Sequence, residues 1–276
     1  MTHTRRQLQA LLAERGVTPS RALGQNFVVD PNTVRRIARL AGVGHGDHVV
    51  EVGAGAGSLT LALAETGASV VALELDRHVL PVLRESVEPL GAQVQVVEGD
   101  AMALDWPALL SGAAAWTLVA NLPYNVATPL VLDLLEGAPT IARMLVMVQR
   151  EAGERLVAEP GSRTYGIPSV RVAYRATARL VGRVGPDVFL PRPRVDSVLV
   201  EITRLPGPVV GADPERMFEL VRHGFGQRRK MLRRSLAGLV PDGAFEAAGV
   251  APTARAEELS IHDWGRLTDA VVSYGS

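Results

Sequence analysis

Cysteine is absent from this chain of 276 residues, and Lys230 is its only lysine. Without cysteine there is no disulfide framework, thiolate zinc site, iron–sulfur cluster or cysteine nucleophile. Long hydrophobic runs are missing too, because no apolar stretch approaches the roughly 20 residues that span a membrane. Residues 1–15 lack the apolar core of a signal peptide. We therefore expect a cytoplasmic protein without membrane contact.

A net charge is also lacking, because 29 basic residues balance 29 acidic ones. Hydrophobic residues make up 47% and charged residues 21% of the chain, which excludes wholesale disorder. The charges are nevertheless segregated. Residues 44–141 hold twelve acidic and two basic residues, whereas residues 161–195 hold seven arginines and one acid. This pattern is compatible with a polyanionic partner, although basic faces that are solvated and paired in three dimensions would show it equally.

Strands and helices alternate through the middle of the chain. Helical patterns separate the expected strands, which cover residues 48–52, 69–75, 93–98, 116–121 and 143–149. Unbroken apolar strands that are separated by helices indicate a parallel sheet covered on both faces. Residues 178–184 and 197–204 resemble two more strands with no helix between them, which predicts an antiparallel edge.

Both ends of the chain are expected to be helical. Helices at residues 4–15 and 31–40 precede the first strand. After the Pro/Gly segment 206–211, only helices are expected, at about residues 214–225, 228–238, 243–248 and 262–273. We therefore predict an α/β, Rossmann-like domain at residues 1–206 with an N-terminal helical extension, and a small all-helical domain at residues 207–276.

A glycine-rich turn follows the first expected strand and has the sequence Glu51-Val52-Gly53-Ala54-Gly55-Ala56-Gly57-Ser58. A strand, such a turn and a helix make a cradle in which the backbone can approach a cofactor closely. Ser58 stands where the dinucleotide fingerprint needs its last glycine, and the phosphate-loop pattern is absent. This disfavours a dinucleotide-dependent dehydrogenase. A tight turn that is purely structural and binds no ligand is an alternative interpretation.

Polar side chains end the next three strands. Glu74 lies where a Rossmann-type fold holds the hydroxyls of a ribose. Asp100 could accept a hydrogen bond from the exocyclic amine of an adenine, or simply start a turn. The fourth strand ends in Asn121-Leu122-Pro123-Tyr124, whose amide, rigid proline and aromatic face suit a flat base with an exocyclic amine. Because the carboxyl ends of parallel strands line one crevice, these strand ends together indicate a ligand site.

These motifs resemble those of the ribosomal RNA adenine N6-dimethyltransferases, most closely the bacterial branch that acts on 16S ribosomal RNA. The similarity covers about residues 21–236 and is looser beyond them. It also includes the segments Gly24–Val28, Val148–Glu151 and Phe189–Ser197. Val28 stands where leucine is common and Ala54 where proline is common, and neither departure removes a functional group.

The resemblance implies S-adenosylmethionine as the methyl donor, and no metal. The six histidines share no spacing typical of metal ligands. The acidic centre of the chain suits the cationic sulfonium of this donor. The implied donor contacts are the methionine portion, the ribose and the adenine, made by Asn26, Val28, Gly53, Glu74, Asp100 and Asn121.

The resemblance also implies a way of activating the adenine N6 amine, whose lone pair is delocalised into the ring. Asn121 and the backbone carbonyl of Leu122 would accept both amine hydrogens, so that the lone pair points at the methyl group. Pro123 would stiffen this clamp. Tyr124 would stack on the base, and Phe189 would cover its other side.

The implied partner is 16S ribosomal RNA in the small ribosomal subunit, bound by a monomer during subunit biogenesis. The reaction would place two methyl groups on N6 of each of two adjacent adenosines in the 3′-terminal hairpin. A basic helix just beyond the domain boundary would contact RNA through Arg222, Arg228, Arg229, Lys230, Arg233 and Arg234. Two alternatives stay open: a 23S ribosomal RNA adenine methyltransferase that confers macrolide resistance, and a non-catalytic ribosome-assembly or transcription factor on the same fold.

Overall fold

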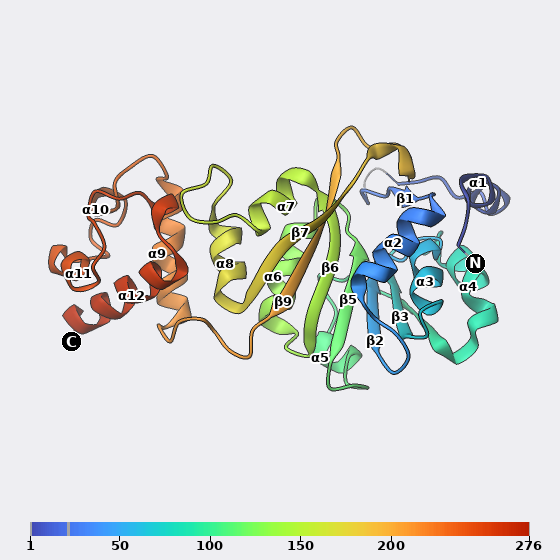
Figure 1. Cartoon of the computed structure of the whole chain (residues 1–276), viewed down its shortest axis with the longest axis horizontal. Helices are drawn as coiled ribbons and strands as arrows, with labels where there is room; N and C mark the ends of the chain where they lie inside the picture. The colour runs from blue at the N-terminus through green and yellow to red at the C-terminus, as the bar shows by residue number, and fades with distance from the viewer. Residues whose placement is uncertain (1, 21–22, 276) are drawn as a thin grey trace. The chain divides into compact units, whose positions relative to one another are not determined.

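The computed structural model describes residues 2–20 and 23–275, and it divides into two compact units (Figure 1). Unit 1 contains the residues up to 153 and residues 179–204, and unit 2 contains residues 154–178 and the residues from 205 onward. The chain passes from unit 1 to unit 2 for the last time between residues 204 and 205, close to the boundary expected at residue 206. The units differ from the expected domains in residues 154–178, which pack with the C-terminal helices.

A seven-stranded sheet dominates unit 1, in the order β4-β3-β2-β5-β6-β9-β7. Strands β2 to β6 pair in parallel, as the sequence predicts. Strand β9 pairs antiparallel with β6 and lies next to β7 at the edge of the sheet. The sheet therefore has the α/β, Rossmann-like architecture expected. The strands are β2 (His48–Val52), β3 (Ser69–Glu74), β4 (Val94–Glu98), β5 (Trp116–Asn121), β6 (Ile141–Gln149), β7 (Ala176–Val184) and β9 (Ser197–Arg204).

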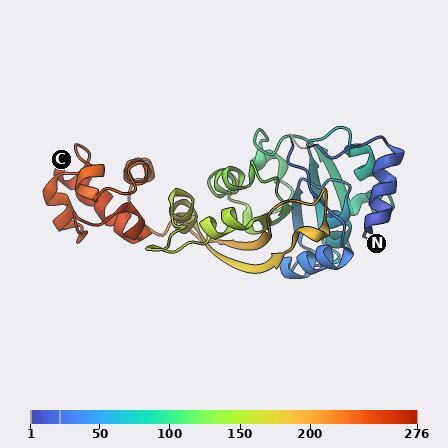
Figure 2. The same cartoon turned by 90° about the horizontal axis from the view of Figure 1, so that it is seen from above.

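Helices cover both faces of this sheet (Figure 2). Alternate strand residues such as Val49, Val119 and Leu145 join one apolar cluster with helices α2 and α3, because successive side chains of a strand point to opposite faces. The helices of this part of the chain are α1 (Arg5–Glu14), α2 (Pro31–Ala41), α3 (Ser58–Ala64), α4 (Leu80–Val87), α5 (Trp106–Leu109), α6 (Ala127–Gly137) and α7 (Arg150–Leu156), with the 3₁₀ helices η1 (Glu88–Gln93) and η2 (Pro186–Val188).

A two-stranded sheet lies apart from the large one. Strand β1 (Phe27–Val28) pairs antiparallel with β8 (Phe189–Leu190), and the sequence predicts neither strand. Two-residue strands carry no periodicity, so the sequence gives no signal for this pairing. The pairing fixes the segment before α2 to the segment before β9.

Unit 2 is helical apart from the start of β7. Tyr165, Phe245 and Trp264 are almost fully buried in its core. Tyr165 precedes α8, which explains why residues 154–178 belong here. The helices are α8 (Ile167–Arg175), α9 (Pro214–Gly226), α10 (Leu232–Ser235), α11 (Asp242–Ala247), η3 (Ala256–Glu258) and α12 (Ile261–Gly275).

The prediction of a basic helix at residues 228–238 is wrong. Residues 227–229 form a turn, residue 230 lies in a bend, and only the short α10 follows them. The Leu232 amide donates to the Ala254 carbonyl and the Arg233 amide to the Pro252 carbonyl, each at 2.8–3.0 Å. These amides would bond to preceding carbonyls in a continuous helix. Tertiary backbone contacts with residues 252–254 therefore replace the helix that the local pattern favours.

Candidate functional site

One cavity of about 230 Å³ opens where the carboxyl ends of β2, β3 and β5 meet. It brings together nine of the ten residues that the sequence assigns to the cofactor and the target base. They come from the N-terminal segment, the glycine turn and three strand ends: Asn26, Val28, Gly53, Glu74, Asp100, Asn121, Leu122, Pro123 and Tyr124.

Phe189 is the tenth residue, and the structure places it elsewhere. Its side chain is fully buried in the cluster under α2 and does not line the cavity. The backbone of Phe189 pairs with Val28 across the small sheet. Stacking on a base would require this side chain to leave its packing. Phe27, which the sequence analysis did not assign, lines the cavity instead.

The glycine turn is held to β3 and takes left-handed backbone conformations. The amides of Gly53 and Ala54 both donate to the Leu73 carbonyl, at 2.9 and 3.0 Å. Gly55 has φ +57°, and a Cβ there would lie 2.9 Å from two ring carbons of Phe27. A residue with a side chain is thus disfavoured at Gly55 both by its backbone conformation and by close approach.

Glu74 is buried at the end of β3 and organises the loops around it. One carboxylate oxygen accepts from the Gly55 amide at 2.7 Å. The other accepts from the amides of Leu75 and Asp76, both at 2.9 Å. Burial raises the pKa of Glu74, and these hydrogen bonds oppose the rise. Because a carboxylate offers about four acceptor positions, one remains for a ligand hydroxyl.

Glu51 and Ser58 also line this cavity, and the sequence predicts a ligand role for neither. Burial raises the pKa of Glu51 to about 8, which the nearby Glu74 reinforces and the hydrogen bond from Thr60 opposes. Glu51 therefore keeps its proton near neutral pH. The Ser58 hydroxyl is buried without a hydrogen-bond partner. A buried, unsatisfied hydroxyl that lines a cavity is available to a polar group of a ligand or to water.

The strand end at Asn121 offers two free acceptors side by side. The Asn121 side-chain Nδ2 donates to the Asn26 carbonyl at 2.8 Å, which leaves Oδ1 as the free end of the amide. The Leu122 amide donates to the Met147 carbonyl at 3.1 Å, which fixes this peptide against β6. Within residues 2–20 and 23–275, no group donates to Asn121 Oδ1 or to the Leu122 carbonyl.

Tyr124 completes this side of the cavity. Its hydroxyl lies 3.1 Å from the Ser197 hydroxyl at the start of β9, and burial raises the pKa of the phenol. The Pro123 carbonyl accepts from the Ala127 amide at 3.1 Å, so the turn runs directly into α6. Ser197 is a residue that sequence reasoning missed as an anchor for the ring, although it lies in a segment that the resemblance covers.

The remaining polar residues at the cavity make internal contacts. Asp100 accepts from the Met102 amide at 2.9 Å through one oxygen, as a residue that starts a turn would. The Asn26 side chain donates to the Gly24 carbonyl at 3.0 Å. Gln25 reaches the Asp76 carboxylate at 2.8 Å. This last contact joins the N-terminal segment to the loop after β3, and no motif in the sequence signals it.

The six basic residues expected to contact RNA divide into two groups in unit 2. Five of them are exposed: Arg222, Arg229, Lys230, Arg233 and Arg234. Arg228 is half-buried and forms an ion pair with Glu257 at 2.5 Å. A guanidinium that is already paired is a poorer phosphate ligand than an exposed one.

Residues 2–20 and 23–275 hold neither a cluster of metal ligands nor a membrane-spanning helix. No group of three or more His, Cys, Asp or Glu side chains there could hold a metal ion. None of the helices there combines the length and the apolar character that crossing a membrane requires.

The sequence resembles a known family over almost its whole length. Residues 18–272 match the family described as ribosomal RNA adenine dimethylase. Proteins named ribosomal RNA small subunit methyltransferase A are similar to it. The one from Kineococcus radiotolerans is 49% identical over 265 residues, covering 93% of this chain and 87% of that protein. The one from Bifidobacterium longum subsp. infantis is 45% identical over 285 residues, covering 97% and 93%.

Solved structures resemble it in fold. A dimethyladenosine transferase from Plasmodium falciparum gives a TM-score of 0.77 at 22% identity, covering 89% of this chain and 97% of that one. The 23S rRNA methyltransferase ErmE gives a TM-score of 0.69 at 25% identity, covering 89% and 99%.

Proposed function

Because the chain belongs to the ribosomal RNA adenine dimethylase family, we propose that it transfers methyl groups from S-adenosylmethionine to N6 of two adjacent adenosines in the 3′-terminal hairpin of 16S ribosomal RNA. It is an enzyme of the ribosomal RNA adenine dimethyltransferase type. The neighbouring free acceptors at Asn121 and Leu122, which line the cavity, are the observation that carries the proposal.

The residues present fit S-adenosylmethionine. Glu74 keeps one acceptor position for a ribose hydroxyl. The buried Ser58 hydroxyl has no hydrogen-bond partner and is available to a polar group of the donor. Asp100 uses one carboxylate oxygen in its turn, which leaves the other for an adenine amine. Asn26, Val28 and Gly53 border the region proposed for the methionine portion. When bound, the donor supplies an electrophilic methyl group on a sulfonium.

Asn121 and Leu122 perform the orienting step in this proposal. An adenine amine has two hydrogens, and the two free acceptors can each take one. The lone pair of the amine nitrogen is then less delocalised into the ring and points at the methyl group of the donor. The two reactants are thereby held in a near-attack geometry. Tyr124 offers its ring face to the base, and Ser197 holds that ring in place. The methylated amine is acidic enough to lose its extra proton to water, so no strong base is needed.

Small-subunit RNA is the substrate that the relatives favour. The proteins 45–49% identical to this chain carry small subunit in their names, whereas the 23S rRNA methyltransferase ErmE is 25% identical. We therefore favour action on 16S ribosomal RNA in the assembling small subunit. The protein would work in the cytoplasm as a monomer, with unit 2 docking the subunit.

Mass spectrometry of 16S ribosomal RNA tests the proposal in a strain that lacks this protein. We expect two dimethylated adenosines to disappear and to return when the gene is restored. Purified protein should also methylate small subunits isolated from that strain and leave large subunits unmodified. Methylation of large subunits instead would favour the 23S alternative, and no methylation of either would favour a non-catalytic factor.

A further inference from the structure

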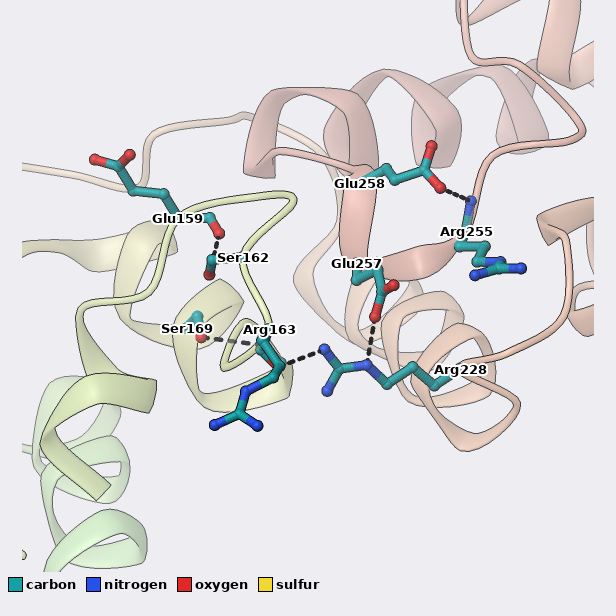
Figure 3. A network of polar contacts seen from close by, with 9 residues as sticks. Glu159, Ser162, Arg163, Ser169, Arg228, Arg255, Glu257 and Glu258 are labelled. Atoms are coloured by element: carbon teal, nitrogen blue, oxygen red, sulfur yellow. Dashed lines mark hydrogen bonds and ion pairs between the residues drawn. The ribbon is translucent and has the colours of Figure 1, made fainter. Parts of the chain in front are cut away.

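Arg228 lies at the centre of a polar network in unit 2 that the proposed active site does not use (Figure 3). Its Nε donates to the Glu257 carboxylate at 2.5 Å, and one terminal nitrogen donates to the Arg163 backbone carbonyl at 2.8 Å. Three distant parts of the chain meet at this guanidinium: the loop 157–166, the turn after α9, and η3. Arg228 is therefore positioned to hold these segments together.

The loop 157–166 is fixed on both sides of Arg163. The Gly161 amide donates to the Glu257 carbonyl at 2.7 Å. Tyr165 is buried, and its hydroxyl donates to the Leu259 carbonyl at 2.9 Å. Between these anchors, Arg228 holds the carbonyl of Arg163 itself. The backbone that carries Arg163 is thus tied to η3 and its surroundings at three points.

The side chain of Arg163, in contrast, is free. It is exposed and points away from the network in Figure 3. Within the described part of the chain, it makes no hydrogen bond or ion pair. Arg229, the residue next to Arg228, is exposed and unpaired in the same sense. The network therefore brings an unpaired arginine of the 157–166 loop close to the basic segment that begins at Arg228.

We propose that Arg163 contacts RNA phosphates together with the exposed basic residues around Arg229, and that Arg228 is a positioning residue for Arg163. This inference rests on the proposed function, because it takes ribosomal RNA as the ligand. A guanidinium suits bidentate phosphate contacts, and a backbone that is already ordered loses less entropy on binding. Glu257 neutralises the charge of Arg228, so this guanidinium stabilises the fold and is not available to a phosphate.

The salt dependence of binding to a 16S ribosomal RNA transcript tests the assignment in a double-mutant cycle. Arg163→Gln should lower the log–log salt slope by about 0.7–0.9, the amount expected for one phosphate contact. Arg228→Gln should lower the slope by no more than this, because it acts through Arg163. The double variant should match Arg163→Gln alone. Donor affinity should be unchanged throughout, and Arg84→Gln, an exposed arginine of unit 1, serves as the matched control.

Additive slope losses in the double variant would overturn the proposal, since Arg228 would then contact RNA itself. An unchanged slope for Arg163→Gln would overturn it as well. Glu257→Gln keeps an acceptor for Arg228 and should retain the wild-type slope, whereas a phosphate ligand released from its counter-ion would steepen it. If the unaltered protein shows no salt-dependent binding, the proposed function itself fails.

Discussion

Asn121 shows how one hydrogen bond determines what a side chain can offer. The side-chain Nδ2 of Asn121 donates to the Asn26 carbonyl, so the side-chain oxygen Oδ1 remains available to a substrate. An aspartate here would lack the donor and would place a negative charge beside that carbonyl. Two requirements therefore favour asparagine at this strand end: a donor for the Asn26 carbonyl and an acceptor for the amine of the base.

Replacing Asn121 with alanine should abolish most methyl transfer while preserving the fold. We expect a loss of at least about 10²–10³ in single-turnover rate, the cost of removing one preorganised polar contact from a transition state. RNA affinity should change little, because phosphate contacts dominate it. Asn32→Ala, on the exposed first turn of α2, is the matched control. A rate within tenfold of wild type would show that Asn121 is structural.

Glu74→Gln should weaken donor binding by at least about tenfold, because hydrogen bonds to a charged acceptor contribute about 1.5–3 kcal/mol each. All the donors around Glu74 are backbone amides, and the glutamine NH₂ would oppose one of them. Calorimetry with S-adenosylmethionine measures the effect. Glu98→Gln is the control, since Glu98 pairs with Glu74 across the strands but is exposed and lies outside the cavity. Equal affinities for the two variants would contradict the role of Glu74.

Glu51 should make folding stability depend on pH. The folded chain retains a proton up to pH 8 that an unfolded glutamate releases near pH 4.5. Stability therefore falls as pH rises through this window, by at most about 1.4 kcal/mol per pH unit from this group. Glu51→Gln removes the titration and keeps an acceptor for Thr60. Urea unfolding at pH 5.5 and 7.5 should show the variant gaining on wild type as pH rises, whereas parallel profiles would argue against a neutral Glu51.

At the scale of elements, the glycine turn is the part whose geometry tolerates least change. Gly55→Ala should weaken donor binding and destabilise the fold, because the new Cβ meets the Phe27 ring and the backbone is left-handed. Gly46→Ala separates these two causes. Gly46 also has a left-handed backbone, φ +89°, but nothing lies within 4 Å of a Cβ there. Its cost should be about 1–2 kcal/mol in thermal unfolding, with donor affinity unchanged. Equal effects of the two variants would mean that contact with Phe27 is unimportant.

The predictability of each element follows from the length of its pattern. Strands β2, β5 and β9 occupy the residues expected from their apolar runs, and α2 begins at residue 31 as expected. Helix α8, which carries Pro168 at its second position, is not among the elements expected from the sequence. The basic segment was misjudged, because contacts with residues 252–254 outweigh its local preference.

The site was predictable for the same kind of reason, up to a limit. Strand ends of a parallel sheet converge by geometry, so sequence alone could place Glu74, Asp100 and Asn121 together. Contacts between distant loops carry no such rule. The bonds of Tyr124 to Ser197 and of Arg228 to Glu257 depend on tertiary packing. Phe189 illustrates the same limit, because its burial depends on a strand pair of two residues.

For the whole molecule, the division of the chain makes a prediction about fragments. Residues 207–276 alone lack Tyr165 and Tyr174, which are buried in the core of unit 2. We expect this fragment to show no cooperative melting by circular dichroism. Restoring residues 154–178 through a short linker to residue 205 should recover it, because the Leu205 amide already bonds to the Arg175 carbonyl at 2.8 Å. Cooperative melting of 207–276 alone would contradict this account.

The position of β9 has a consequence for synthesis on the ribosome. β9 is made after β6 and β7 but lies between them in the sheet. Until residue 204 has emerged, the nine residues of β6 present an unpaired and largely apolar edge. At ~5–20 residues per second, making residues 150–204 takes roughly 3–11 s. Open apolar edges attract other chains, so the nascent protein carries an aggregation-prone edge during this interval.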